Sequence, residues 1–455
     1  MTATVQSTGT GSSATDKATR DAGGSASRAS SDPTLLPRLL PATGQPMDLA
    51  AHHQRHGRLL YRGGPRMLIR TIESAGLTGR GGAAFPTHRK LTTVADQKGV
   101  PVVVGNGAEG EPASDKDKTL LWSSPHLVLD GLQLAAEAVG ARQVHLYVHR
   151  DQHSQLAHHL EYALAERATA RMDRIAVNLV TAPARFLAGE ESALASRVEG
   201  GAALPRFTPP RIFERGVNGA PTLVQNVETL AQLALISRYG SGWFRAVGTT
   251  AEPGSMLTSL RLSDGTGGVA ETPIGTPIAD LLKLREQPAR AVLVGGYHGA
   301  WLSPEQAGSL TLSNADLRPL GAAVGAGVLA ALPVDRCGVV ESARVVRYLA
   351  LESAGQCGPC LNGLPRIAAT LTQLARPQSA PAATSAGDDL QRWSTLVERR
   401  GACHHPDGTV RFMRSALTVF ADEVALHQAG RCSATSYEPF LPIPAGSPAH
   451  EEDWS

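Results

Sequence analysis

Between residues 100 and 180, short apolar runs alternate with segments of helical spacing, and this alternation restricts the possible folds strongly. The runs have the length and the β-branched content of buried strands, and they lie at residues 100–104, 144–148 and 175–180. The segments between them place apolar residues at helical spacing, at residues 127–139 and 155–169. Strands that alternate with helices predict an α/β domain with a parallel sheet.

Outside this region the patterns change. The chain has 455 residues, enough for about two to four domains with cores of their own. Residues 1–33 are rich in Ser, Thr, Ala and Gly, so we expect them to be disordered. Helical spacing returns at residues 222–236 and dominates from residue 339 onward, which predicts a C-terminal helical bundle. Residues 376–388, rich in Pro, Ala and Ser, are expected to form a surface loop.

A glycine-rich loop precedes the first strand. Three of its four residues are Gly79, Gly81 and Gly82, so the backbone can approach a ligand without a Cβ in the way. Arg80 in the loop and Lys90 just beyond it place positive charge beside the exposed amides, which suits a phosphate. Taken alone, such a loop is more typical of a flexible surface turn than of a nucleotide site.

Three further motifs change that interpretation. The first follows the strand at residues 100–104, at the kind of strand end where open α/β sheets hold ligands. The motifs occupy residues 105–112, 189–194 and 221–230, and their polar residues include Asn106, Glu109, Glu111, Glu190, Glu191 and Asn226. A Cys-x-x-Cys pair, Cys357 and Cys360, follows them in the helical region.

The order of these motifs resembles the flavoprotein subunit of respiratory complex I and the related diaphorase subunits of NAD-linked hydrogenases and formate dehydrogenases. The resemblance covers residues 65–431, and five motifs in register make it specific. It implies a Rossmann-like domain for FMN and NADH at residues 34–240, a ubiquitin-like (β-grasp) domain at 241–320, and a helical bundle with an iron–sulfur site at 321–435. The disordered tail at 1–33 and a C-terminal tail at 436–455 would flank these domains.

The resemblance assigns FMN binding to matched positions of the flavin motifs. These are Gly79, Arg80, Gly81, Gly82, Lys90, Asn106, Glu109, Gly189, Glu190, Glu191 and Asn226. Three positions depart from the family pattern, with Ala108 where Asp is usual, Phe186 for Tyr and Gln225 for Asn. Each departure removes or moves a polar contact, but none removes the glycines and Lys90 that would hold the phosphate.

The resemblance also implies a site for NAD(H). Phe85 matches an aromatic residue that stacks near the dinucleotide, while Glu111 and Glu191 match acids that contact it and shape the catalytic pocket. These two acids would repel the 2′-phosphate of NADPH. The family pattern is broken at Thr93, Thr208 and Arg211. Arginines of the same region could stack on the adenine instead, namely Arg206, Arg211 and Arg215.

The family pattern for a [4Fe–4S] cluster has four cysteines, and the matching residues here are Ala354, Cys357, Cys360 and Cys403. Alanine cannot ligate iron, so three thiolates remain. They predict a [3Fe–4S] cluster, or a [4Fe–4S] cluster whose fourth ligand is Ser353, His404 or water; a cluster-free remnant is the third option. A zinc site on the three cysteines and His404 is the alternative metal centre. Cys337 and Cys432 lack ligand spacing and are interpreted as structural.

These implications combine into one predicted function, an NADH dehydrogenase of the diaphorase type. Hydride would pass from NADH to FMN, and single electrons would leave through the cluster. The acceptor would be an iron–sulfur partner subunit or a ferredoxin. The alternative is a homologue that keeps the fold but has lost NADH use, either as a non-catalytic subunit or as a flavoprotein fed by ferredoxin.

Composition excludes several other classes of function. Lys and Arg number 43 against 41 for Asp and Glu, and aromatic residues are only 4%, so nucleic acid is not an expected partner. The sequence has neither an apolar stretch of membrane-spanning length nor a secretory signal core. Five cysteines without a paired framework indicate a reducing compartment. We expect a cytoplasmic protein without membrane insertion, attached at a membrane only through partners.

Overall fold

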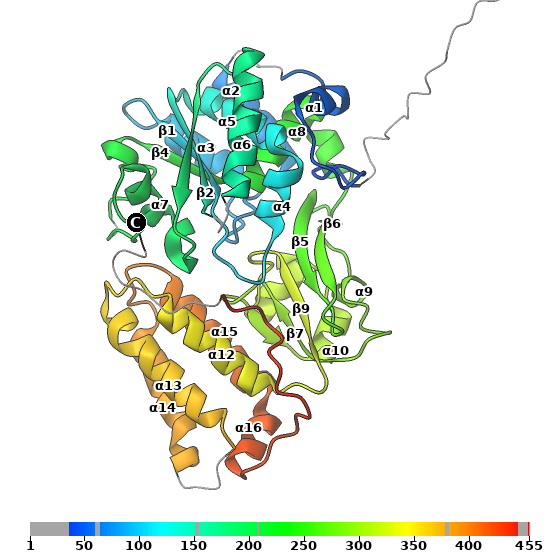
Figure 1. The fold of residues 1–455 in the computed structure, drawn as a ribbon, viewed down its shortest axis with the longest axis vertical. Helices are drawn as coiled ribbons and strands as arrows, with labels where there is room; N and C mark the ends of the chain where they lie inside the picture. Colours follow the sequence, from blue (N-terminus) through cyan, green and yellow to red (C-terminus); the bar gives the residue numbers. More distant parts are fainter. Residues whose placement is uncertain are drawn as a thin grey trace, which may run out of the picture.

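The computed structural model describes residues 36–59, 64–150, 154–207, 209–377, 382–444 and 454. The N-terminal tail expected to be disordered, Thr208 and half of the expected C-terminal tail lie outside the described residues. The described chain forms three parts that follow one another in sequence (Figure 1). A parallel sheet with its helices comes first, a second sheet lies beside it, and a group of helices forms the other end of the molecule.

The first sheet has four strands that pair in parallel, in the order β3-β2-β1-β4. The strands are β1 (Val102–Gly107), β2 (Gln143–His149), β3 (Val177–Ala182) and β4 (Thr222–Asn226). The three apolar runs that predicted strands form β1, β2 and β3, which confirms the α/β class with a parallel sheet. The chain builds outward from β1 to β3 and then returns to the other side of β1 for β4.

The helix expected at residues 222–236 begins later than the sequence indicated. Residues 222–226 form β4, and α8 (Val227–Arg245) starts directly after it. Asn226 caps this helix, because its Oδ1 accepts hydrogen bonds from the backbone N–H groups of Glu228 at 3.0 Å and Thr229 at 3.4 Å. An apolar run this short has no periodicity that separates a strand from a helix, so pairing with β1 decided the outcome.

The sheet is covered by helices on both faces (Figure 1). Besides α8 they are α1 (Leu49–His56), α2 (Pro65–Ala75), α3 (Thr87–Ala95), α4 (Lys116–Ser123), α5 (Pro125–Val139), α6 (Gln155–Thr169) and α7 (Glu191–Val198). Helix α5 is buried almost along its whole length and packs closely on α8. Gly131 permits this approach, since a Cβ there would lie 2.1 Å from the carbonyl oxygen of Leu230.

Asp130 on α5 is the centre of a buried charge cluster. Its Oδ1 lies 2.9 Å from Arg167 Nη1, and its Oδ2 lies 2.9 Å from His52 Nε2 and also contacts Arg238. All four side chains are at most 5% exposed. Burial alone would raise the pKa of Asp130, but the hydrogen bond from His52 and the charges of Arg167 and Arg238 outweigh burial and hold the pKa well below its usual range.

We expect Asp130→Ala to lower the free energy of unfolding by about 3–5 kcal/mol, because it leaves the buried guanidinium of Arg238 without its acid and that of Arg167 with Asp173 alone. The contribution of the carboxylate is present at neutral pH, since its folded pKa is depressed, and is lost as pH falls below the unfolded value of about 3.9. Urea unfolding at neutral pH measures the change. The exposed Asp388→Ala serves as the control, with an expected change within about 0.5 kcal/mol. Equal effects of the two substitutions would contradict this prediction.

The second sheet is mixed and has five strands in the order β6-β5-β9-β7-β8. They are β5 (Ser255–Arg261), β6 (Gly267–Pro273), β7 (Ala289–Val294), β8 (Ala300–Leu302) and β9 (Val328–Pro333). Short helices accompany them at α9 (Ile278–Leu281), α10 (Pro304–Ser309) and α11 (Asn314–Leu317). Apolar runs at residues 255–262 and 292–294 predict strands and correspond to β5 and β7, whereas no such prediction was made for β6, β8 or β9.

The C-terminal part is helical, as its apolar spacing predicts. It contains α12 (Gly338–Leu351), the π-helical turn η4 (Pro359–Gly363), α13 (Leu364–Leu374), α14 (Ala382–Val397), α15 (His405–Val419) and α16 (Ala421–Gln428). Two expectations need correction. Helix α14 begins inside the expected loop at 376–388, and the single helix expected at 410–428 is divided near Phe420. Among the described residues, no helix is long and apolar enough to cross a membrane.

Candidate functional site

The last residues of β1 and β4 line a cavity of about 430 Å³ at the carboxyl ends of these strands, together with the glycine-rich loop. The two strands are neighbours in the sheet, and Asn106 of β1 pairs in register with Asn226 of β4. The order of the strands reverses between β1 and β4, and open α/β sheets bind ligands at such a reversal. The cavity therefore lies where the fold class places a ligand.

Most residues predicted for FMN and NADH line this cavity. They are Gly79, Gly81, Phe85, Lys90, Asn106, Gly189, Glu190, Glu191 and Asn226. Cys403, predicted as a cluster ligand, lines the same cavity. The other predicted residues do not line it, namely Arg80, Gly82, Glu109, Glu111, Cys357 and Cys360. Motifs that are far apart in the sequence thus meet around one space.

Gly81 and Gly189 leave the wall of the cavity without side chains. A Cβ on Gly81 would lie 3.2 Å from the Cβ of Asn226, and a Cβ on Gly189 would lie 2.4 Å from the carbonyl oxygen of Ala108. Neither glycine has a positive φ, so lack of space rather than backbone conformation favours glycine here. The exposed backbone can therefore contact a ligand directly.

Two charged residues of the cavity, Lys90 and Glu191, are paired with each other, and a third, Glu190, caps a helix. Lys90 Nζ donates a hydrogen bond to Glu191, and the two side chains are 24% and 49% exposed. Glu190 caps α7, because its Oε2 accepts from the N–H groups of Ser192 at 2.9 Å and Ala193 at 3.0 Å. An ion pair as exposed as Lys90–Glu191 contributes little stability, so a phosphate can replace Glu191 as the partner of Lys90 at small cost.

The Arg80 side chain lies away from the cavity, in the interior behind the glycine-rich loop. Its Nη1 donates to Thr78 Oγ1 at 2.9 Å, and its Nη2 donates to the carbonyl oxygen of Ser255 at 3.2 Å. Its Nε lies 4.0 Å from Glu228, and both side chains are at most 5% exposed. In this structure Arg80 holds the loop to the second sheet, while Lys90, Arg206 and Arg211 line the cavity.

Glu109 and Glu111 are buried as well. Glu111 connects the first part of the chain to the second, because its Oε2 accepts from the N–H of Tyr297 at 2.7 Å. Burial raises the pKa of Glu111 to about 7, against the effect of hydrogen bonds from Tyr297 and Ala113. Burial, together with the nearby charge of Asp117, raises the pKa of Glu109 to about 8. The contacts of Glu111 thus join two parts of the fold, and its role toward a dinucleotide stays a prediction.

The three thiols predicted to bind the cluster gather where the helical part meets the cavity. Cys357, Cys403 and Ser353 all lie close enough to Cys360 to affect the pKa of its thiol. Burial raises the pKa of Cys360 to about 12 and that of Cys403 to about 11. Thiolates at these positions need a bound cation such as iron to offset that cost.

The alternative zinc site at these thiols does not fit the geometry. His404, which it requires, is fully exposed and lies 3.7 Å from Asp407. Within the described part of the chain, the one group of three or more such side chains whose ligand atoms all lie within 4.8 Å of one another is elsewhere. The exposed His404 therefore does not support a zinc site at these thiols.

Glu352 connects the cluster loop to the flavin side of the site. It follows α12 directly, and its Oε2 accepts from the N–H of Phe186 at 2.9 Å and pairs with Arg185 Nε at 3.2 Å. Phe186 begins a short 3₁₀ turn that ends at Gly189 in the cavity wall. The Glu352 side chain is 9% exposed. A buried carboxylate therefore fixes the start of the cluster loop to the loop that carries Gly189.

Gln225 provides a test of whether the cavity suits a polar ring. It lines the cavity and is 4% exposed, yet its Nε2 has no hydrogen-bond partner among the described residues. A buried amide without a partner costs free energy, which a ligand that accepts its hydrogen bond would recover. This donor, the bare glycine wall and Lys90 together fit the ring and the phosphate of FMN. The sequence had marked Gln225 only as a departure from the family.

Several lining residues were not found from the sequence. They include Ser192, Ile212, Phe213, Val224 and Thr229. Of these, Phe213 could have been found from the sequence. It is an aromatic residue two positions after Arg211, which stands where the family pattern has a stacking Phe. The aromatic face that the pattern lacks at Arg211 is thus present nearby.

Comparison with protein families supports both cofactors. The Nuo51 FMN-binding domain matches residues 72–235. The NADH-ubiquinone oxidoreductase-F iron-sulfur binding region matches residues 341–427. The predictions of FMN and of an iron–sulfur cluster are confirmed by these two matches.

Curated relatives agree with this result. The NADH-quinone oxidoreductase F 2 subunit of Rhizobium meliloti is 29% identical over 80% of this chain and 89% of its own length. The NADH-quinone oxidoreductase F subunit of Salmonella typhimurium is 30% identical over 79% of this chain and 84% of its own. The alpha subunit of the NAD-reducing hydrogenase HoxS of Cupriavidus necator is 30% identical over 74% and 57% of the two chains.

A crystal structure of an NAD⁺-reducing [NiFe]-hydrogenase in the air-oxidized state has a TM-score of 0.71 and 30% sequence identity, and the match covers 84% of this chain. The chain spans only 65% of that hydrogenase chain. The structural likeness confirms the mixed α/β fold with a parallel sheet. The protein described here, with its FMN-binding domain and iron–sulfur region, belongs to the family of NADH-quinone oxidoreductase F subunits.

Proposed function

We propose that the protein oxidises NADH through FMN and passes the electrons through an iron–sulfur cluster to an iron–sulfur partner subunit or a ferredoxin. The observation that carries this proposal is the shared cavity, which Gly81, Asn226 and Cys403 line together. FMN, when bound, accepts two electrons and releases them one at a time. The chain's part is to hold the flavin and the cluster close together. The alternative that has lost NADH use is not favoured, because relatives on both branches are NAD-linked enzymes.

The cavity residues divide into those that hold the flavin and those that admit the dinucleotide. Backbone amides beside Gly81 and the ammonium of Lys90 suit the phosphate, and Gln225 Nε2 is a free donor for a ring oxygen or nitrogen. Asn106 holds the loop, since its Nδ2 donates to the Gly189 carbonyl at 2.8 Å. Phe85 is 51% exposed and lines the cavity, so its face is open to a second planar ligand.

The proposed cluster ligands are Cys357, Cys360 and Cys403. Ser353 is the favoured protein candidate for the fourth ligand, because it lies close enough to Cys360 to affect the pKa of that thiol, whereas His404 is fully exposed. Burial of the thiols keeps water from the cluster and makes iron necessary for thiolate formation.

The finer fold assignment belongs to this proposal. The five-stranded mixed sheet with its short helices suits a ubiquitin-like (β-grasp) domain, and because β9 at residues 328–333 is its middle strand, this domain extends to residue 333 rather than ending at the expected residue 320. The helices from α12 onward suit a bundle that carries the cluster and begins at residue 338 rather than at the expected residue 321. The named relatives are subunits of larger enzymes, which supports an iron–sulfur subunit as the partner.

Anaerobic NADH is expected to bleach the flavin absorbance within seconds, whereas NADPH at the same concentration acts at least tenfold more slowly. The discrimination arises from Glu191, the one predicted dinucleotide acid that lines the cavity, because its charge repels a 2′-phosphate. Stopped-flow spectroscopy measures both rates. Glu191→Gln should narrow the difference between the nucleotides by about tenfold, equivalent to ~1.4 kcal/mol.

The matched control is Glu161→Gln on the exposed face of α6, which should leave the ratio of the two rates unchanged. Dithionite reduces the flavin without a nucleotide site and so reports that the flavin is intact. If dithionite reduces the flavin and neither nucleotide does at saturation, the proposal of NADH oxidation fails and the ferredoxin-fed alternative replaces it.

A further inference from the structure

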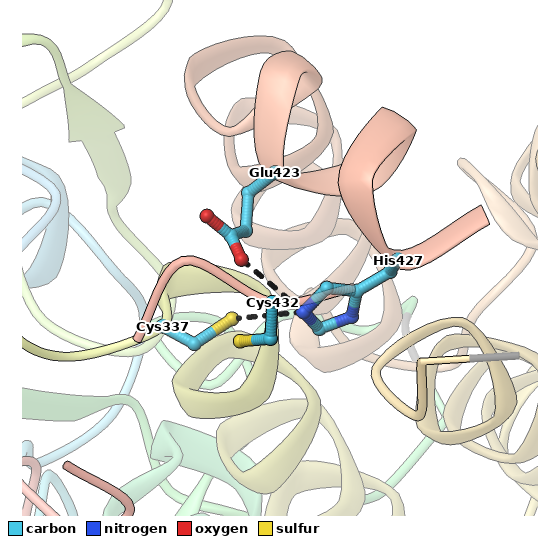
Figure 2. A group of neighbouring side chains, drawn as sticks. All are labelled: Cys337, Glu423, His427 and Cys432. Atoms are coloured by element: carbon cyan, nitrogen blue, oxygen red, sulfur yellow. Dashed lines mark hydrogen bonds and ion pairs between the residues drawn. The ribbon is translucent and has the colours of Figure 1, made fainter. Parts of the chain in front are cut away.

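Four side chains with metal-binding atoms meet in the helical part, in a cluster that the iron–sulfur site does not include (Figure 2). They are Cys337, Glu423, His427 and Cys432, and their ligand atoms all lie within 4.8 Å of one another. Cys337 caps α12, Glu423 and His427 lie one turn apart on α16, and Cys432 follows α16. Three of the four residues are at most 5% exposed, and Cys432 is partly buried.

The separations match those of ligands around one tetrahedral zinc ion. Zinc bonds of about 2.3 Å to sulfur and about 2.0–2.1 Å to nitrogen or oxygen place sulfur and nitrogen about 3.6 Å apart, and nitrogen and oxygen about 3.4 Å apart. The Sγ of Cys337 lies 3.5 Å from His427 Nε2, and Oε1 of Glu423 lies 3.3 Å from the same nitrogen. Figure 2 shows the three atoms directed toward a common point, with the Cys432 sulfur beside them.

His427 is oriented as a ligand requires. Its Nδ1 lies 3.1 Å from the carbonyl oxygen of Leu374, which can only accept a hydrogen bond, so this contact places the ring proton on Nδ1. Nε2 then carries a lone pair and faces the sulfur atoms and the carboxylate. A backbone acceptor on the far nitrogen is the usual arrangement around a metal-binding histidine.

The other ligands are held in place as well. Glu423 accepts hydrogen bonds from the N–H of Ser433 at 2.8 Å and from Arg290 Nη1 at 3.2 Å. Cys337 Sγ lies at the N-terminus of the 14-residue helix α12, 3.4 Å from the N–H of Val340, where negative charge is favoured. These contacts fix the side chains from β7, α12 and the segment after α16.

We propose that Cys337, His427, Cys432 and Glu423 bind a zinc ion. All four tetrahedral positions are filled by protein, so the site is structural and leaves no place for a substrate. The ion joins the start of α12 to α16 and to the segment that follows it. Two soft thiolates with an imidazole and a carboxylate select zinc over magnesium or calcium.

A bound metal would also give these buried polar atoms a common partner. The ligand atoms of the four residues lie within 4.8 Å of one another, and three of the four residues are at most 5% exposed, so bulk water cannot satisfy these polar atoms. The rival explanations are a metal-free hydrogen-bonded cluster and a disulfide between the two cysteines. Measured metal content and a mass spectrum distinguish both explanations from a zinc site.

The test is the metal content of anaerobically purified, full-length protein after a brief wash with chelator. We expect about one zinc per chain in the wild type, in addition to the iron of the cluster. Zinc K-edge X-ray absorption should show two sulfur neighbours at about 2.3 Å and two nitrogen or oxygen neighbours at about 2.0–2.1 Å. Cys337→Ser should lower zinc at least fivefold and leave iron and flavin unchanged.

Cys403→Ser is the matched control, since it removes a cysteine from the iron–sulfur site and should leave zinc in place. Zinc that falls with Cys403→Ser but not with Cys337→Ser would belong to the cluster thiols and overturn the proposal. Wild-type protein with less than about a tenth of a zinc per chain, or a Cys337–Cys432 disulfide in its mass spectrum, would also overturn it. If Cys337→Ser fails to fold, the sulfur count in the wild-type X-ray absorption spectrum decides.

Discussion

Gly81→Val is expected to abolish FMN binding and leave a folded, colourless protein. Even one methyl group at this position would lie 3.2 Å from the Cβ of Asn226, and the branched side chain of valine would extend into the space that the loop leaves for the ligand. Purified wild-type protein should hold about one FMN per chain, and the variant less than about a tenth of that. The flavin absorbance band and the release of FMN on denaturation measure both values.

Gly308→Val is the matched control, because Gly308 lies on α10, its φ is not positive and no atom would contact an added Cβ. This control should keep its flavin. Circular dichroism of Gly81→Val must show wild-type helix content, so that flavin loss is not confused with unfolding. A folded Gly81→Val protein that retains FMN would show that the phosphate binds elsewhere and that the assignment of the glycine-rich loop is wrong.

Restoring the missing cysteine is expected to change the iron content in a defined way. The wild-type site has three cysteines and Ala354, so one iron has no thiolate from the protein and is lost in air to give a [3Fe–4S] form. Ala354→Cys should raise iron from about three toward four per chain after exposure to air. It should also remove the electron paramagnetic resonance signal of the oxidised three-iron form.

Cys403→Ser tests the same site by removing a ligand instead of adding one. Loss of one of only three thiolates should reduce iron to below about one per chain, measured by plasma mass spectrometry. Cys337→Ser, in the same helical part but outside this site, should leave the iron unchanged. Protein that is free of iron after anaerobic preparation, with no response to Ala354→Cys, would mean that the site is a remnant. The electrons would then have to leave the flavin directly to a partner.

Local pattern predicted the first sheet well, because buried parallel strands have continuous apolar runs. Residues 102–107, 143–149 and 177–182 could be read in this way. The strand at 222–226 could not, because it merges into a long apolar helix, and only its pairing with β1 distinguishes the two. The strand at 328–333 lies in a Gly- and Ala-rich stretch, and local pattern did not mark it as a strand either.

The cavity was predicted better than the direction of individual side chains. Motif order brought Gly81, Asn106, Glu191 and Asn226 together correctly. Sequence could not show that Arg80 turns toward Ser255 and Glu228, because those partners lie about 150 residues or more away along the chain. The direction of a side chain in a loop depends on partners that are distant along the chain, and the sequence alone does not show which residues those partners are.

Cys337 and Cys432 show a different limit. They were interpreted as structural because no short spacing links them, yet they meet at one point with His427 and Glu423. A signal was present, since His427 and Cys432 stand five positions apart around the end of a helix. Its partner Cys337 lies on another helix, and only the packing of α12 against α16 brings it there.

The contact of Glu352 with Phe186 and Arg185 has a consequence for the rate of electron transfer. Electron tunnelling between two centres falls exponentially with the gap between them, so small fluctuations in that gap change the rate greatly. The buried carboxylate of Glu352 ties the segment after α12 to the loop that carries Gly189, and with both centres bound it would limit such fluctuations. Loss of the Glu352 carboxylate would thus broaden the distribution of electron-tunnelling rates without altering either redox centre.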